Sequence, residues 1–143
     1  MEEIYRNYIH GYHAEDILGV TLEDVINKHL HFKKLVKTSE YYGVEIDGKL
    51  YPNQLNQLDV SEKALFDAFY SVFMSKYFDI VVLRYPENYM HIAHQNILID
   101  ELMKILDGRQ LIIITNSPDI IGYHWYRQVD LGEQYQADIN DKN

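Results

Sequence analysis

The fold is decided by residues 79–118, which read DIVVLRYPENYMHIAHQNILIDELMKILDGRQLIIITNSP. The apolar run over residues 80–83 predicts a strand buried on both faces, and residues 111–115 predict a second one. Between them, residues 91–106 have helical periodicity, and Asp107-Gly108 is a typical helix end. Strand, helix and strand in this order predict a parallel α/β unit with a right-handed crossover.

The segments upstream predict two helices and a hairpin. Residues 61–78 place apolar side chains on one helical face, with Asp59 or Ser61 as the N-cap. Thr21 can cap a helix that runs to about Lys37. The polar side of that helix would carry the basic cluster Lys28, Lys33, Lys34 and Lys37. Asp47-Gly48 lies between apolar runs and predicts a tight β-hairpin, whose second strand Pro52 would end.

Downstream, Ser117 and Pro118 predict a short helix that Gly122 ends, and a last strand is expected over roughly residues 125–131. No linker, repeat or low-complexity segment divides the 143 residues, so we expect one domain over residues 1–143. It would consist of a mainly helical part (1–40), an α/β part (44–131) with a small, mostly parallel sheet and flanking helices, and a loose tail (132–143).

The composition limits the classes of partner. Apolar residues make up 47% of the chain, which is typical of a packed domain, and the net charge is −9. This charge opposes binding to nucleic acid or to an anionic membrane, so we expect neither. There is no cysteine, which excludes disulfides and thiolate chemistry. The first residues lack the pattern of a signal peptide, and no apolar run approaches the roughly 18 residues that span a bilayer, so a cytoplasmic protein is expected.

One short pattern raises the question of nucleotide binding. Gly43 and Gly48-Lys49 fit the phosphate-binding pattern GxxxxGK[ST] except at its last position. A working phosphate loop follows a buried strand and opens a helix, and neither neighbour is predicted here. Glu45 and Asp47 would also place carboxylates beside the phosphates, where like charges repel. The sequence therefore favours a hairpin over a phosphate loop.

Four later segments occur in a familiar order: GKLYPNQLNQLDVSEKALFDAF, DIVVLRYPENYMH, LIIITNSPDII and YRQVDLGE. Over roughly residues 44–132 they resemble the second half of ABC-type ATPase domains, in the branch found in DNA repair and phage defence. The corresponding family segments read approximately LSSGEK, DEPENxLH, THSPEIL and LEDG. The resemblance implies a partial P-loop NTPase core, and the first strand and phosphate loop of that core have no counterpart before Gly43.

The resemblance also implies that the nucleotide site is degenerate. At the family positions for the metal-holding Asp and the water-orienting Glu, this chain has Arg84 and Tyr85, which suit neither task. The family His that senses the γ-phosphate aligns with Asn116. The signature Ser and Gly align with Asp59 and Ser61, and Asp59 would repel phosphate. We therefore expect a pseudo-ATPase half-domain that uses no cofactor.

Two further groups of residues suggest sites. His91 and His94 lie three apart on a predicted helix, after Glu87, and are weak candidates for metal ligands because no third ligand is fixed; His10, His13, His29 and His31 are weaker still. No Ser, His and acid arrangement lies in a recognisable elbow, so nucleophilic catalysis is not predicted. Arg84 and the aromatic side chains form a candidate interaction patch of residue types enriched at interfaces: Arg84, Tyr85, Tyr89, Tyr123, Trp125 and Tyr126.

Three functions follow as expectations. The first is a non-catalytic interaction protein, with a protein partner or as a homodimer, that docks on and regulates or blocks another chain, such as a complete ATPase of the same family. The second is an ATPase subunit whose nucleotide site is completed by a partner chain. The third is an acidic decoy or immunity-type protein that acts through its charge.

Overall fold

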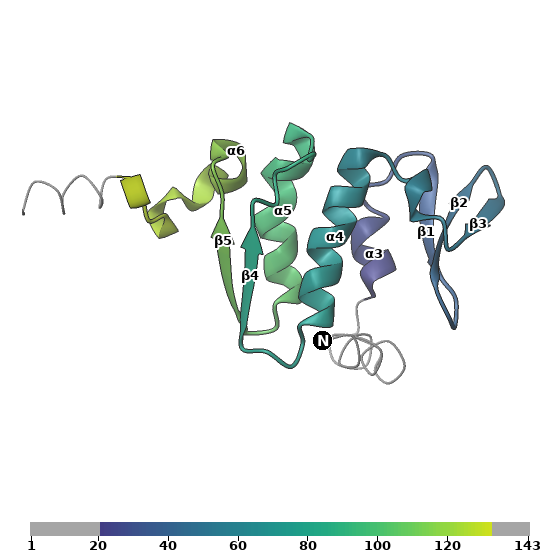
Figure 1. Cartoon of the computed structure of the whole chain (residues 1–143), viewed down its shortest axis with the longest axis horizontal. Coiled ribbons are helices and arrows are strands. Elements are labelled where there is room, and N and C mark those ends of the chain that lie inside the picture. Colours follow the sequence, from purple (N-terminus) through teal and green to yellow (C-terminus); the bar gives the residue numbers. More distant parts are fainter. Residues whose placement is uncertain (1–20, 133–143) are drawn as a thin grey trace, which may run out of the picture.

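The computed structural model describes residues 21–132 and shows a mixed α/β protein with two separate sheets (Figure 1). The α/β prediction is confirmed at this level, although the parallel sheet has only two strands. The loose tail from Glu133 and the early histidines His10 and His13 lie outside the described residues. The elements are α3 (Leu22–Ile26), β1 (Lys33–Lys37), β2 (Tyr42–Ile46), β3 (Lys49–Pro52), η1 (Leu55–Gln57), α4 (Val60–Met74), β4 (Ile80–Arg84), α5 (Ile92–Ile105), β5 (Gln110–Ile114), α6 (Pro118–Ile121) and η2 (Gly122–Arg127).

The prediction of one helix from Thr21 to Lys37 is correct only for the residues up to Ile26. Thr21 caps α3 as expected, but α3 ends at Ile26 and residues 33–37 form strand β1. The side-chain amide of Asn27 explains the change, because it donates to Leu35 O at 3.0 Å and accepts from Leu35 N at 2.7 Å. This pair of bonds holds the strand against the end of α3. Lys33, Lys34 and Lys37 therefore lie on a strand of a sheet, and not on the polar side of a helix.

The antiparallel sheet has the order β1-β2-β3, and its tight turn is the predicted hairpin. Ile46 pairs with Lys49, and both turn residues have positive φ, 50° at Asp47 and 77° at Gly48. Gly43 lies inside β2, where an added Cβ would come within 3.0 Å of the Leu50 side chain. The pattern over residues 43–49 is thus a hairpin, as the sequence favours, and no helix follows it.

The helices α4 and α5 form the middle of the molecule (Figure 1). Asp59 caps α4 in a capping box with Glu62, and His91 caps α5. Both helices contribute fully buried side chains, such as Leu65, Phe69 and Leu98, to one hydrophobic core. These two helix predictions are confirmed, including the end of α5 before Asp107-Gly108.

The strands β4 and β5 pair in parallel, with Val82 opposite Ile112, as the sequence predicts. The expectation that residues 80–83 and 111–115 are buried on both faces is wrong. Val81 and Leu83 belong to the core, whereas the alternate residues of both strands are exposed. The reason is that the helices cover one face of this pair, and a parallel sheet is normally covered on both.

The segment from Pro118 to Arg127 is helical. Ser117 caps α6, which begins at Pro118 and ends before Gly122, as predicted. The strand expected over residues 125–131 is wrong, because the 3-10 helix η2 takes residues 125–127 and no strand forms over residues 128–131. Apolar side chains of this segment are not buried, since Trp125 is 71%, Val129 67% and Leu131 71% exposed. They give this segment no apolar face on which a strand could pack.

Candidate functional site

The carboxyl ends of β4 and β5 meet at one edge of the parallel pair, which we call the carboxyl edge (residues 84–90 and 115–117). Tyr85 N donates to Ile114 O at 2.7 Å, and Asn116 N donates to Glu87 Oε1 at 2.9 Å. Tyr85 and Asn116 therefore follow the ends of neighbouring strands, as predicted from the sequence, and Arg84 is the last residue of β4. This is where sites form in open α/β sheets.

The loop after β4 is held in an unusual backbone conformation. Tyr85 and Tyr89 have positive φ values of 49° and 65°, which bulky residues rarely adopt. The Arg84 guanidinium lies over the Tyr85 ring at 5.5 Å. Such conformations persist only where surrounding contacts hold them, and here the bond from Tyr85 N to Ile114 O and the Glu87–Asn116 bond do so.

The chemistry available at the carboxyl edge is limited. Glu87 is the only carboxylate within residues 84–90 and 115–117, and its Oε1 already accepts the Asn116 N–H. Its Oε2 is buried without a hydrogen-bond partner among the described residues. Magnesium bound with a triphosphate generally uses one or two protein carboxylates together with a group that positions the attacking water. Arg84 and Tyr85 supply neither.

Asp59 and Ser61 lie at the start of α4 and serve its structure. Asp59 Oδ1 accepts the Glu62 N–H at 2.8 Å. The Ser61 hydroxyl oxygen accepts the His91 N–H at 2.7 Å and lies 2.6 Å from His94 Nδ1. The Ser61 hydroxyl therefore accepts from the backbone at the start of α5 and also shares a hydrogen bond with the His94 ring. Ser61 thus joins the start of α4 to the first turn of α5.

The sequence did not predict the contact between Ser61 and His94, because the two residues are 33 positions apart and belong to no local motif. Burial, reinforced by the nearby His29, lowers the pKa of His94, which favours its neutral ring. Neither Ser61 nor His94 lines the nearby groove. Because the bonds of Ser61 join α4 to α5, the pair is best explained as a structural bridge.

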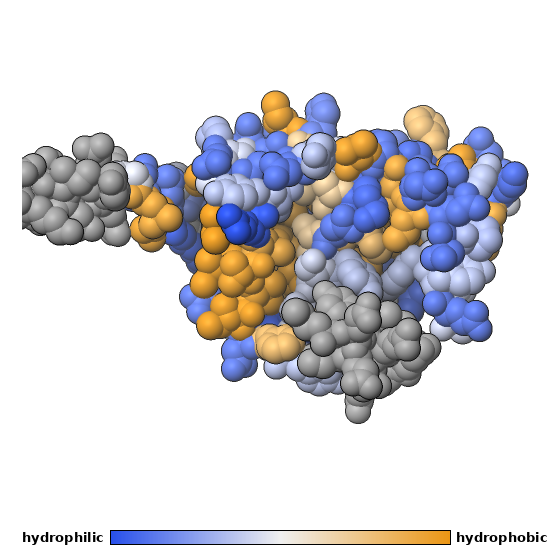
Figure 2. Space-filling view, viewed as in Figure 1, coloured by the Kyte–Doolittle hydropathy of each residue, from blue (hydrophilic) through white to orange (hydrophobic). Residues whose placement is uncertain are grey.

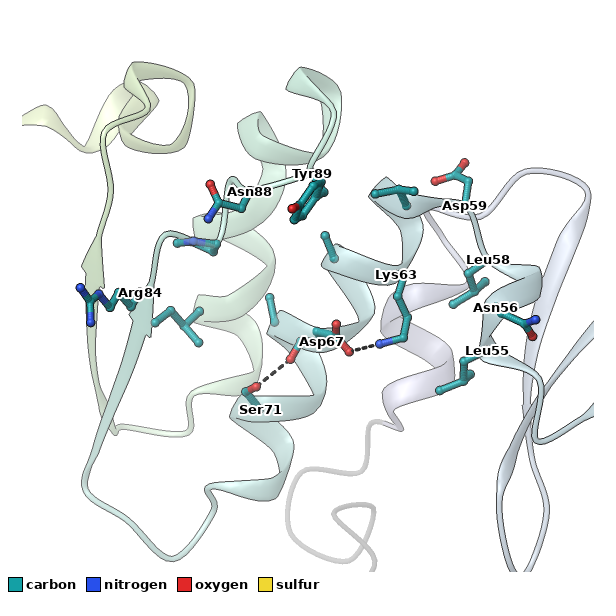
Figure 3. A pocket seen from close by; sticks show the side chains of 15 residues that line it. Leu55, Asn56, Leu58, Asp59, Lys63, Asp67, Ser71, Arg84, Asn88 and Tyr89 are labelled. Atoms are coloured by element: carbon teal, nitrogen blue, oxygen red, sulfur yellow. Dashed lines mark hydrogen bonds and ion pairs between the residues drawn. The ribbon is translucent and has the colours of Figure 1, made fainter.

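A groove of about 530 Å³ lies near the carboxyl edge, between α4 and β4 (Figure 3). Its α4 side includes Lys63, Ala64 and Asp67, and its other side includes Leu83 and Tyr89. Lys63 and Asp67 form an ion pair on the helix, and the Arg84 guanidinium points away from α4 (Figure 3). The groove therefore presents small and apolar groups, together with charges that are already neutralised.

The aromatic residues of the candidate patch belong to two different segments of the chain. Tyr85 and Tyr89 lie in the loop after β4, and Tyr89 lines the groove beside α4. Tyr123, Trp125 and Tyr126 lie in η2, which follows α6 beyond β5 (Figure 1). The sequence did not show this division, because it depends on how α6 turns the chain away from the sheet.

A second apolar surface lies on the parallel pair of strands. Alternate residues of β4 and β5 form what we call the bare face, where Ile80 is 53% exposed, Val82 54%, Ile112 41% and Ile114 40%. Figure 2 shows this apolar surface gathered over the two strands. All four side chains are β-branched, and the strand register places Val82 directly opposite Ile112, with Ile80 opposite Gln110 and Ile114 opposite Arg84. The apolar runs in the sequence signalled these residues, but they did not show that one face would be left uncovered.

His91 and His94 do not form a metal site in this arrangement. His94 Nδ1 is engaged by Ser61, and His91 Nδ1 accepts the Ala93 N–H. Between Thr21 and Gly132, no three histidine or carboxylate side chains gather closely enough to hold a metal ion. His29 and His31 add no third ligand to them, and His29 lies 3.7 Å from Glu101 instead.

Comparison with protein-family models and with curated protein sequences finds no match to this chain. None of the helices in the described part of the chain is both long and apolar enough to cross a membrane. The features of the molecule that bear on function are therefore the carboxyl edge, the groove and the bare face.

Proposed function

We propose that this chain is a non-catalytic interaction protein that docks on another protein and regulates or blocks it. The bare face carries this proposal. Burying one large aliphatic side chain completely is worth roughly 1.5–3 kcal/mol, so covering four half-exposed ones would contribute about 3–6 kcal/mol to an association. A contiguous apolar surface of this kind on a folded domain typically marks a binding site.

The chemistry of the carboxyl edge supports the non-catalytic part of the proposal. Arg84 and Tyr85 stand where a metal ligand and a water-positioning residue would be needed, and Glu87 is already bonded to Asn116. The resemblance to ABC-type ATPases suggests the partner class, namely a complete ATPase of that kind, in DNA repair or in phage defence and its counter-defence. The parallel pair has helices on one face and none on the other, so it resembles a domain core that lacks one layer. A partner protein that packs on the uncovered face would supply this layer.

The proposal is tested by a charge placed on the bare face. Ile112→Lys should abolish capture of the partner from host extract by the immobilised chain. Leu50→Lys is the matched control, because Leu50 is similarly exposed at 39% but lies on β3, in the other sheet. Identification of the captured protein by mass spectrometry would name the partner class. Equal capture by both variants, or no capture by the native chain, would contradict docking through the bare face.

The non-catalytic part has its own test. Titration of ATP with Mg²⁺ into the purified chain should give no saturable binding heat, and no phosphate should be released. Saturable binding that Arg84→Ala or Tyr85→Phe abolished would favour an ATPase subunit instead.

A further inference from the structure

The parallel pair has two open edges, and the hydrogen bonds show which backbone groups lie on each. Tyr85 N donates to Ile114 O, and Gln110 N donates to Asp79 O at 2.8 Å. In parallel strands, alternate residues turn their N–H and C=O groups to the same neighbour. Residues 79, 81, 83 and 85 therefore bond to β5. The N–H and C=O groups of Ile80, Val82 and Arg84 point outward from the pair.

The carboxyl end of β4, at Leu83 and Arg84, lies beside the groove on α4 (Figure 3). A further strand would lie about 4.8 Å from β4, above the helix. The residues of α4 beneath that position include Ala64, Ala68 and Ser71, which are small and leave room for side chains from above. The helix α4 thus lines a groove next to the end of β4, where the sheet stops.

The charges of the groove indicate the kind of segment that fits. Lys63 is paired with Asp67 at 2.5 Å, and Asp59 is bound at the helix N-terminus. The Arg84 guanidinium is directed away from α4 over Tyr85. The charged residues that line the groove therefore balance, with Asp59 and Asp67 against Lys63 and Arg84, although the chain as a whole carries −9. An uncharged segment complements this surface, because a charged one would lose hydration there without gaining a partner.

We infer that β4 receives an extended, uncharged segment of the partner protein as an added strand. The inference rests on the proposed function and specifies how the partner is held. The main chain of the segment bonds to the outward groups of Ile80, Val82 and Arg84. One set of its side chains lies over Ala64 and Ala68, and these side chains are small. The alternate set extends the row of Val82 and Ile112 on the bare face, and these side chains are apolar.

Selection from a display library of random twelve-residue peptides tests the inference. The chain should enrich peptides with alternating small and apolar residues and no net charge. The Val82→Pro variant should bind them about tenfold more weakly, which corresponds to the loss of one hydrogen bond. Val82 N–H points away from β5, so proline at this position leaves the β4–β5 ladder intact. Failure to enrich any peptide, or equal binding by Val82→Pro, would overturn the inference.

Two control variants show whether the effect of Val82→Pro comes from the backbone of β4. The first tests the Val82 side chain, and the second tests the open edge of β5. Val82→Thr keeps the N–H and the shape of the side chain, so it should bind nearly as well as the native chain. Ile113→Pro removes an outward N–H from the open side of β5 and should also retain binding. Weakened binding by Ile113→Pro, with Val82→Pro unaffected, would place the added strand on β5 and overturn the inference for β4.

Amide hydrogen exchange in the native chain provides a measurement that needs no variant. The Val82 and Arg84 amides should exchange rapidly in the free protein and be protected when a selected peptide is bound. Protection in the free protein at every concentration would mean that residues 1–20 or 133–143 already occupy the edge. Protection that increases with protein concentration would mean that a second copy occupies it. Either result overturns the inference, whereas the Ile112→Lys capture experiment tests the proposed function separately.

Discussion

The antiparallel sheet β1–β3 and the parallel pair β4–β5 meet solvent in different ways. The outer strands of the antiparallel sheet carry Lys33, Lys34 and Pro52, which are residue types that protect an edge from pairing with another chain. Its middle strand buries Val44 completely. In the parallel pair, residues 80–83 contain no charge and no proline. The first sheet is complete in itself, whereas the second has the composition of a sheet that another layer should cover.

The sharpest test of this comparison places one charge in each sheet. Val44→Asp should lower the free energy of unfolding by roughly 3–5 kcal/mol, because an unpaired charge would replace a fully buried side chain. Ile112→Lys should lower it by less, roughly 1 kcal/mol, because this side chain is already 41% exposed and the long Lys side chain can reach water. Urea denaturation followed by circular dichroism measures both variants. Similar losses would show that the bare face is covered within the free protein.

A second test concerns the contact that ties the antiparallel sheet to α4. Lys33 Nζ lies 2.8 Å from Glu62 Oε2, and Glu62 is buried. Glu62→Gln should destabilise the chain by about 2 kcal/mol, since Lys33 would lose its charged partner while remaining partly buried. The Lys63–Asp67 pair on the same helix is exposed, so the control Asp67→Asn should lose less than about 0.5 kcal/mol. Equal urea midpoints for the two variants would contradict this account.

A third test concerns the support of the parallel pair at its other end. The Arg109 guanidinium donates to the carbonyl oxygens of Leu106, Val72 and Ile105, at the C-terminal ends of α4 and α5. Arg109→Met should lower the free energy of unfolding by roughly 1.5 kcal/mol, because these carbonyls would lose charged donors. The exposed Arg84→Met serves as the control and should remain within about 0.5 kcal/mol of the native value.

The smallest expected effect is a dependence on pH. Burial lowers the pKa of His94 in the folded state below its ordinary value of 6.5, and the charge of His29 contributes. The contribution of His94 to stability is therefore fully present above pH 6.5 and is lost as the pH falls through that value toward the folded pKa. Urea midpoints at pH 7.5 and 5.5 should show this loss. It should be reduced in His94→Gln and retained in the exposed control His91→Gln.

Local signals in the sequence were sufficient for most elements. The hairpin at Asp47-Gly48 requires positive φ at both positions, and few other residue pairs tolerate this. Asp59 and Ser117 each cap a helix through bonds to residues three positions later, so their roles are visible in the sequence. The apolar runs in β4 and β5 indicated a parallel pair. The positions of Arg84, Tyr85 and Asn116 at one edge followed from that pairing.

The errors arose where a distant contact decided the local structure. The predicted helix through Lys37 is interrupted because Asn27 bonds to the backbone of Leu35, and helical spacing alone does not reveal such a bond. The expected burial of β4 and β5 on both faces assumed a second helix layer, which no local pattern can guarantee. The bridge from Ser61 to His94 likewise depends on how α4 and α5 pack.

The separation of paired residues along the chain also has a consequence for folding. Ile46 and Lys49 are three positions apart, whereas Ile80 and its partner Gln110 are separated by 30. Short-range pairings form quickly, and long-range parallel ones form late because a long loop must first close. Until β5 arrives, β4 exposes both edges and both faces to other chains. The yield of refolding should therefore fall as the protein concentration in the refolding mixture is raised.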